Sequence, residues 1–100
     1  MKYRINYSKV IQQANLISDN ADQLNDQITR LNQLEQECRA CWKGETAEIF
    51  ILRLNQLRNE MTRTKTQMVN LSSTIKYCAD RIQREDRDAE RRAIALKSGN

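Results

Sequence analysis

Gly44 is the only glycine before position 99 in a chain of 100 residues that contains no proline. Glycine and proline are the residues that interrupt helices, and glycine enters a left-handed backbone conformation without steric cost. A chain with a single internal break of this kind is restricted to one long helix on either side of it. We therefore expect an all-α fold, in which the chain reverses direction at Gly44 and forms an antiparallel two-helix hairpin.

Apolar residues recur in alternating steps of four and three on both sides of Gly44, which predicts two helices that pack along a common seam. Before Gly44 the seam comprises Val10, Ala14, Ile17, Ala21, Leu24, Ile28 and Leu31, and it continues after a shift of phase at Leu34, Cys38 and Cys41. After Gly44 it comprises Phe50, Leu54, Leu57, Met61, Thr64, Met68, Leu71, Ile75, Cys78 and Ile82.

The expected single domain covers residues 1–100, with the first helix over about 8–41, the turn at 42–45 and the second helix over about 46–96. Ser8 is the expected N-cap of the first helix. Helix lengths place Leu31 opposite Leu57 and leave the residues after about Arg84 without a partner from the first helix. We expect this C-terminal segment to project past the hairpin, where it is either disordered or recognised by another molecule.

A single seam between two helices buries a stripe rather than a core, so we expect no stable monomer. Seven apolar residues lie off the main seam: Ile11, Leu16, Leu34, Ile49, Ile51, Leu52 and Val69. They are either scattered surface residues or a second contact face, and we favour the second interpretation. The expected assembly is a dimer of hairpins that forms a four-helix bundle.

The charge pattern does not indicate a nucleic-acid binder. The formal net charge is +4, but bases and acids alternate over residues 84–92, which is typical of a solvated helix surface. No apolar run approaches the ~20 residues of a membrane-spanning helix, and residues 1–16 lack the apolar core of a signal peptide. We therefore expect no nucleic-acid partner, no membrane insertion and no ordinary secretory route.

The side chains give little support for catalysis or metal binding. The chain has no histidine to activate a serine or cysteine, and no glycine-rich loop to hold a phosphate. Cys38 and Cys41 form a C-x-x-C pair, which can indicate redox chemistry or half of a zinc site. However, the pair ends a helix, and Cys78 lies about 50 Å away along the helix axis. We interpret Cys38 and Cys78 as small seam residues, and expect no enzyme activity, no cofactor and no metal.

The hinge carries the most specific motif of the chain. Trp42, Gly44, Ala47 and Phe50 follow the spacing W-x-G-x-x-A-x-x-F at the sole break between two heptad helices. In this setting the whole chain resembles the Trp-x-Gly (WXG, ESAT-like) family of helical hairpins of bacterial type VII secretion. The resemblance implies a small secreted substrate, or a targeting chaperone or adaptor for one. The alternative is a non-secreted coiled-coil structural or assembly subunit, which would have no need for the tryptophan hinge.

The resemblance also implies a location, partners and an export signal. The protein would leave the bacterial cytoplasm folded, without a cleaved signal peptide, for the medium or the cell surface. Its partners would be itself or a related hairpin, a larger secreted toxin, and the secretion ATPase. Many family members carry Tyr-x-x-x-Asp/Glu after the second seam. Here Tyr77 is followed by an acid one position early, at Asp80, whereas Ile82 and Asp86 have the right spacing with isoleucine in place of tyrosine.

The role of Trp42 is left open between two compatible possibilities. Its ring either plugs the end of the hairpin or enters a groove on a partner.

Overall fold

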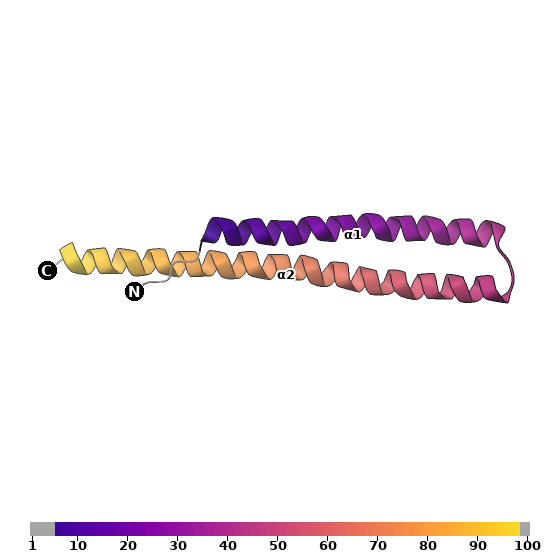
Figure 1. Ribbon diagram of the computed structural model, residues 1–100. Coiled ribbons are helices and arrows are strands. Elements are labelled where there is room, and N and C mark those ends of the chain that lie inside the picture. Colours follow the sequence, from indigo (N-terminus) through magenta and orange to yellow (C-terminus); the bar gives the residue numbers. More distant parts are fainter. Residues whose placement is uncertain (1–5, 99–100) are drawn as a thin grey trace.

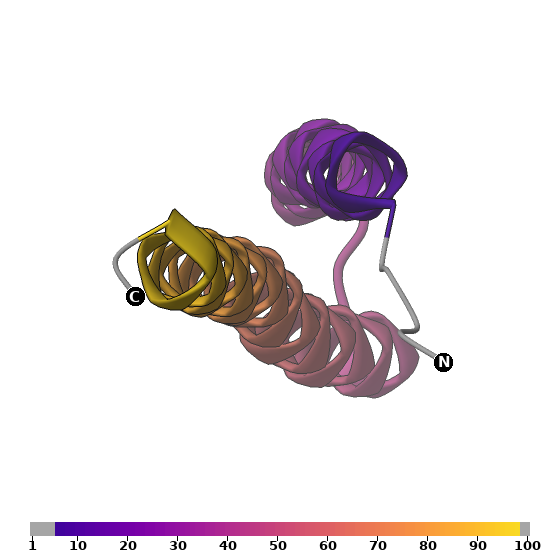
Figure 2. The same cartoon turned by 90° about the vertical axis from the view of Figure 1, so that its left-hand side faces the viewer.

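The computed structural model describes residues 6–98, which form two long helices joined by a short hinge (Figure 1). Helix α1 covers Tyr7–Cys41, with 35 residues, and helix α2 covers Glu45–Ser98, with 54 residues. The helices lie side by side and run in opposite directions, as the end-on view also shows (Figure 2). The predicted all-α hairpin is therefore confirmed.

Asn6 is the N-cap of α1. Its side-chain oxygen accepts a hydrogen bond from the backbone N–H of Lys9 at 3.1 Å, which satisfies one of the free amide groups of the first turn. The expectation that Ser8 caps this helix is wrong, because Ser8 already lies within its first turn. Asn6 caps the helix in place of Ser8, so the helix begins two residues earlier than expected.

The chain reverses direction within residues 42–44. Trp42 has extended backbone angles, and its N–H donates to the carbonyl of Cys38 at 2.8 Å, so it closes the last turn of α1. Gly44 has a φ of 114°, which L side chains rarely adopt, and its carbonyl accepts the N–H of Glu48 at 3.0 Å. Glu45 and Glu48 place negative charge in the first turn of α2, where it stabilises the positive end of the helix dipole.

The buried residues of α1 follow an unbroken heptad pattern. The partly or fully buried positions of this pattern are Val10, Ala14, Ile17, Ala21, Leu24, Ile28, Leu31, Glu35 and Cys38, and Tyr7, Ile11 and Ser18 are partly buried beside them. The predicted shift of phase after Leu31 is wrong, because Leu34 is 39% exposed and Cys41 is exposed. Glu35 takes the next position of the seam instead, although it is charged.

The buried row of α2 differs from the predicted one. The positions that face α1 are Ala47, Ile51, Leu54, Arg58, Met61, Lys65, Met68, Ser72, Ile75 and Ala79. The prediction is wrong for Leu57 and Leu71, which are 46% and 51% exposed. Thr64 and Cys78 are also exposed, as are Phe50 and Ile82.

Polar groups on α1 explain why α2 turns this row inward. Arg58 donates to Asn32 at 2.8 Å, and Lys65 donates to Asn25 at 2.8 Å. Further along the seam, the buried hydroxyl of Ser72 donates to the backbone carbonyl of Ala14 at 2.7 Å. Polar groups can line a contact when they are hydrogen-bonded, and α1 supplies a partner for each of these three side chains.

The contact between the helices is built from small residues. Ala14, Ala21, Ala47 and Ala79 are buried with Ile51, and within the described residues no large side chain is fully buried. The hairpin is 85 Å long and only 19 × 15 Å across, and α2 continues past the start of α1 (Figure 1). Neither helix, as far as the structure describes it, has a segment sufficiently long and apolar to span a membrane.

Candidate functional site

The Trp-x-Gly hinge presents an aromatic pair to solvent. The rings of Trp42 and Phe50 are 5.4 Å apart at an interplanar angle of 52°, a tilted arrangement that aromatic rings favour. Trp42 remains 41% exposed and Phe50 39% exposed. The contact therefore fixes the position of the indole ring without covering it, and leaves an apolar projection at the hinge end of the molecule.

The other two motif residues shape the backbone around this pair. Gly44 supplies the positive φ, and a Cβ atom built on it would meet no atom within 4 Å. The requirement for glycine at this position is therefore one of backbone conformation and not of space. Ala47 is 1% exposed at the first contact of α2 with α1, where a larger side chain would push the helices apart.

One row of α2 lies beside the buried row and faces solvent. We call it the outer stripe, and it consists of Phe50, Leu57, Thr64, Leu71 and Cys78. The residues repeat every seven positions, so the stripe keeps a constant angle to α1 along the hairpin. The hydroxyl of Thr64 donates to the carbonyl of Glu60 at 3.1 Å within its own helix, which leaves its methyl group as the free part of the side chain. The stripe is therefore apolar along its length.

The outer stripe is one edge of a broader surface that both helices form. Next to it lie the partly buried residues Leu54, Met61, Met68 and Ile75. Val10 and Gln13 of α1 line a shallow hollow of about 440 Å³ together with Ile75, Asn6 and Lys9. Val10 is the first residue of a row on α1 that continues through Ile17, Leu24 and Leu31. This row therefore lies on the same side of the hairpin as Leu54, Met61, Met68 and Ile75 of α2. We call this side the apolar face, and the end of the molecule at which α1 begins the open end.

The opposite side of the hairpin is polar. Asn25 and Asn32 receive the hydrogen bonds of Lys65 and Arg58 on this side. A second hollow, of about 350 Å³, lies here near the hinge and is lined by Arg39, Glu48, Ile51, Leu52 and Asn55. The two sides of the hairpin therefore differ in chemistry, and the outer stripe with the exposed Leu57 and Leu71 lies on the apolar face.

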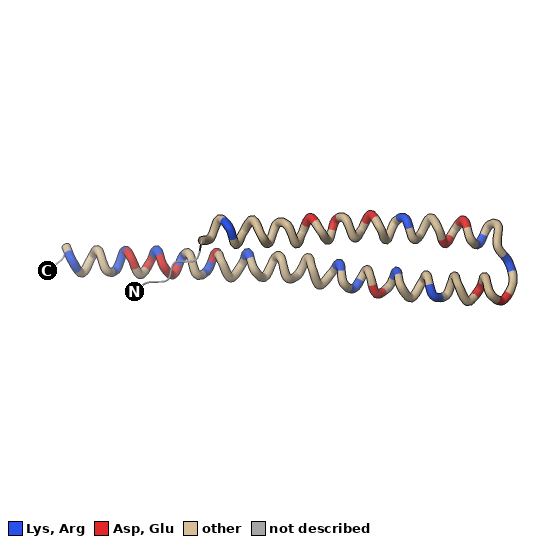
Figure 3. Tube along the Cα trace, in the orientation of Figure 1, with Lys and Arg blue, Asp and Glu red and all other residues tan. Residues whose placement is uncertain are grey.

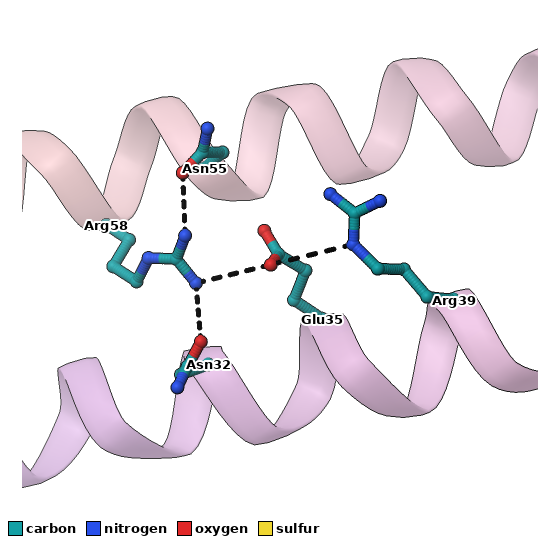
Figure 4. Close-up of polar contacts among 5 residues, drawn as sticks. All are labelled: Asn32, Glu35, Arg39, Asn55 and Arg58. Carbon is teal, nitrogen blue, oxygen red and sulfur yellow. Dashed lines mark hydrogen bonds and ion pairs between the residues drawn. The ribbon is translucent and has the colours of Figure 1, made fainter.

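A polar layer crosses the seam near the hinge, and sequence reasoning did not identify it (Figure 4). Arg58 donates to Asn32 at 2.8 Å and to Asn55 at 2.7 Å, and its Nη1 lies 3.4 Å from Oε2 of Glu35. Arg39 approaches the same oxygen at 3.7 Å. Glu35 is only 9% exposed, and its Oε1 has no hydrogen-bond partner among the described residues. The signal in the sequence was a charged residue at the next heptad position after Leu31.

The candidate export residues lie on two different sides of α2 near the open end. Tyr77 is 61% exposed and accepts a hydrogen bond from Arg81 at 3.4 Å, and Asp80 forms an ion pair with Arg84 at 3.1 Å. Ile82 and Asp86 instead occupy the next heptad positions of the two rows of α2 that face α1, although both residues are exposed. Asp86 accepts a hydrogen bond from the hydroxyl group of Tyr7, the first residue of α1. The expectation that α1 has no contact beyond about Arg84 is therefore wrong by two residues.

The cysteines do not form a joint site. Cys38 is partly buried, while Cys41 is exposed and donates to the carbonyl of Glu37 at 3.0 Å. The interpretation of Cys78 as a seam residue is wrong, because it is exposed on the outer stripe. Within residues 6–98 no three side chains of the metal-binding types come together.

Comparison with known proteins gives one match. The family model described as "WXG100: Proteins of 100 residues with WXG" matches residues 2–87, which include both helices up to the contact of Tyr7 with Asp86. No curated protein and no solved structure shows significant similarity to the chain.

Proposed function

The chain belongs to the WXG100 family of small helical proteins, and we propose on this premise that it is a substrate or targeting partner of bacterial type VII secretion. Members of this family are secreted proteins without enzymatic activity, and they typically pair with one another. The protein acts by binding a helical partner and by presenting itself, or that partner, to the secretion ATPase. It is synthesised in the bacterial cytoplasm and then reaches the medium or the cell surface.

The observation that carries the proposal is the hinge. A two-helix coiled coil requires a turn, and Gly44 alone provides it. The turn does not require a tryptophan that is 41% exposed and fixed against Phe50. Aromatic side chains that remain exposed on a rigid support are typical anchors of protein–protein contacts. The indole ring of Trp42 is therefore assigned to a partner and not only to the hairpin itself.

The segment that the export machine recognises is assigned to Ile82 and Asp86. An apolar side chain and an acid four residues apart lie on one side of a helix, and Ile82 is 38% exposed. The hydrogen bond from Tyr7 holds Asp86 at the open end, so this pair is presented only when the hairpin is folded. Such an arrangement suits a protein that is exported in its folded state. The alternative is that the export signal lies on a larger toxin of similar helical fold, with which this protein would be exported.

The first test compares export in two bacterial hosts that differ only in the type VII secretion ATPase. We expect the protein in the culture supernatant or on the cell surface of the complete host, and only in the cytoplasm of the deficient host. Trp42→Ala is expected to lower export, whereas Leu52→Ala, at an exposed position away from the hinge pair, is not. Equal export from both hosts would favour the alternative of a subunit unrelated to type VII secretion.

The second test distinguishes the two candidate signals. We expect the double substitution Ile82→Ala and Asp86→Ala to abolish export, while far-UV circular dichroism shows unchanged helicity. The matched control is the double substitution Tyr77→Ala and Asp80→Ala on the other side of the same helix, which should be exported normally. If the control variant is retained and the first variant is exported, the signal lies at Tyr77 and Asp80.

A further inference from the structure

Helix α2 has one row of residues that two different seams can share. We call it the shared row, and it consists of Leu54, Met61, Met68 and Ile75. Its neighbour in the observed seam is the polar row, which consists of Arg58, Lys65 and Ser72. The outer stripe lies on the other side of the shared row and faces solvent. With 3.5 residues per turn, neighbouring heptad rows are about 50° apart around the helix axis, so a rotation of α2 by about 50° would exchange the polar row for the outer stripe.

The seam that this rotation would create has suitable chemistry. The outer stripe has no charged residue between Phe50 and Cys78, and residues 66–75 of α2 carry no charge at all (Figure 3). The shared row would then lie over Ala14 and Ala21, which are buried and small, so that they leave room for longer side chains. The rotation therefore moves aliphatic side chains into the contact without adding a charge to it.

The contacts that hold the polar row in place are modest. Ser72 is the short side chain of this row, and its hydrogen bond of 2.7 Å to a backbone carbonyl of α1 requires it to lie deep in the seam. Arg58 and Lys65 are long, so they can still reach α1 from the edge of the seam. In the observed arrangement Oε1 of Glu35 has no partner among the described residues. Burial of the outer stripe would offset the loss of these contacts, because burying aliphatic side chains stabilises more than a single hydrogen bond.

We infer that α2 is a rotary switch with two positions of the outer stripe. In the outward position, which the structure shows, the stripe faces solvent and the polar row faces α1. In the inward position the stripe packs against α1 and the polar row faces solvent. Packed helices shift between discrete arrangements of this kind, because intermediate rotations leave side chains without a groove to fill. The rotation decides whether Leu57 and Leu71 are available at the surface.

Both ends of the hairpin are coupled to the position of the stripe. At the hinge, Phe50 is the first residue of the stripe and its ring centroid lies 5.4 Å from that of Trp42, so an inward rotation separates the two rings. At the open end, Asp86 occupies a heptad position of the polar row and accepts the hydrogen bond of Tyr7, which the same rotation breaks. One rotation therefore hides the outer stripe, releases the indole ring of Trp42 and separates Asp86 from Tyr7.

Cys78 is a natural probe of the switch, because it lies on the outer stripe and is exposed. The test uses the purified full chain with Cys38 and Cys41 replaced by serine, so that Cys78 is the single thiol. A soluble aromatic disulfide reagent reacts with an exposed thiol and is excluded from a thiol that is buried between helices. The rate of this reaction, at submicromolar protein concentration, reports the fraction of molecules in the outward position.

Ser72→Gln is the variant that favours the inward position. Ser72 is buried, and a glutamine is too long for the space beside Ala14 but is readily solvated on the outer surface. We expect the variant to slow the reaction of Cys78 by about tenfold, while far-UV circular dichroism shows unchanged helicity. The matched control is Ser73→Gln, the same change at the neighbouring exposed position, which should leave the rate unchanged.

A triple variant tests whether the outer stripe itself protects Cys78. Leu57→Gln and Leu71→Gln, added to Ser72→Gln, remove the aliphatic side chains that stabilise the inward position. Cys78 should then react at the rate of the cysteine-substituted background, since a stripe that contains glutamines gains nothing in the seam. Glutamine is a good helix former, so the substitutions keep α2 helical.

The emission of Trp42 separates rotation of the whole helix from a local change. Trp42 is the single tryptophan, and its emission should shift in Ser72→Gln because Phe50 moves away from it. Position 72 lies about 40 Å from the hinge along α2, so a local rearrangement around it does not reach the two rings. Ser73→Gln should leave the emission unchanged.

Four outcomes would overturn the inference. These are a faster or unchanged reaction of Cys78 in Ser72→Gln, protection that persists in the triple variant, protection that depends on protein concentration, and unchanged emission of Trp42 while Cys78 is protected. Dependence on concentration would show that association covers Cys78 in place of rotation. None of these measurements depends on export, so they test the switch independently of the proposed function.

Discussion

Removing the guanidinium group of Arg58 tests whether the polar layer stabilises the hairpin. Arg58→Met keeps an unbranched apolar side chain in the seam but leaves Glu35, which is 9% exposed, with only the approach of Arg39 at 3.7 Å. Breaking a buried ion pair by removing one partner costs about 3–5 kcal/mol. The side chain of Arg58 is itself 22% exposed, so we expect the lower end of that range, about 3 kcal/mol.

Replacing both members of the pair should restore most of this loss. In the double variant Glu35→Leu and Arg58→Met the buried charge is absent, and apolar replacements of buried pairs are often neutral or stabilising. We therefore expect the free energy of unfolding of the double variant to lie within about 1 kcal/mol of the unmodified protein. The remaining acceptors, Asn32 and Asn55, are exposed or partly exposed and can bind water in place of Arg58.

The measurement is urea unfolding followed by far-UV circular dichroism, with all variants at one protein concentration so that effects of concentration are the same for each. Arg84→Met is the matched control, since it breaks the ion pair with Asp80 between side chains that are 73% and 53% exposed. Exposed pairs contribute about 0–1 kcal/mol. If Arg58→Met were no more destabilising than Arg84→Met, or if the double variant were less stable than Arg58→Met, this account of the polar layer would be refuted.

Two other predictions concern the hinge and the end of α2. Gly44→Val should lower the free energy of unfolding by about 1–3 kcal/mol, because a β-branched residue resists the φ of 114°; Gly44→Asn should cost less, and equal stability of all three proteins in urea unfolding would contradict a role of backbone conformation. Deleting residues 87–100 should leave the urea midpoint almost unchanged, because the described residues of this segment are exposed apart from Glu90, and a large drop in the midpoint would show that the end of α2 stabilises the hairpin.

The path of the chain could be predicted from the sequence because few residue types interrupt a helix. The absence of proline and the position of Gly44 were sufficient for two long helices and one reversal. The heptad of α1 was also evident up to Leu31, since apolar residues occupy both of its rows. It was lost at Glu35, because a hydrophobicity pattern cannot recognise a charged residue that is buried against a partner on another helix.

The choice of the inward row of α2 was not predictable from hydrophobicity alone. The predicted seam and the observed seam of α2 both contain Leu54, Met61, Met68 and Ile75. They differ in the second row of residues, which lies on one side of these four or on the other. The row that contains Leu57 and Leu71 is more apolar than the row of Arg58, Lys65 and Ser72, and apolar content alone selects it. The selection depends on hydrogen-bond partners across the seam, namely Asn25, Asn32 and the carbonyl of Ala14. Only the arrangement of both helices shows that these partners are present.

The inward turn of the polar row determines which side chains the hairpin leaves exposed. If α2 had turned Leu57 and Leu71 toward α1, the single hairpin would have buried its largest aliphatic side chains, and the outward row would have been polar. Instead the described residues include no large side chain that is fully buried, and alanines form most of the buried contact. Burial of aliphatic side chains is the main source of stability in water. Since Leu57 and Leu71 are 46% and 51% exposed on the apolar face, the single hairpin gains little stability from burying its large aliphatic side chains.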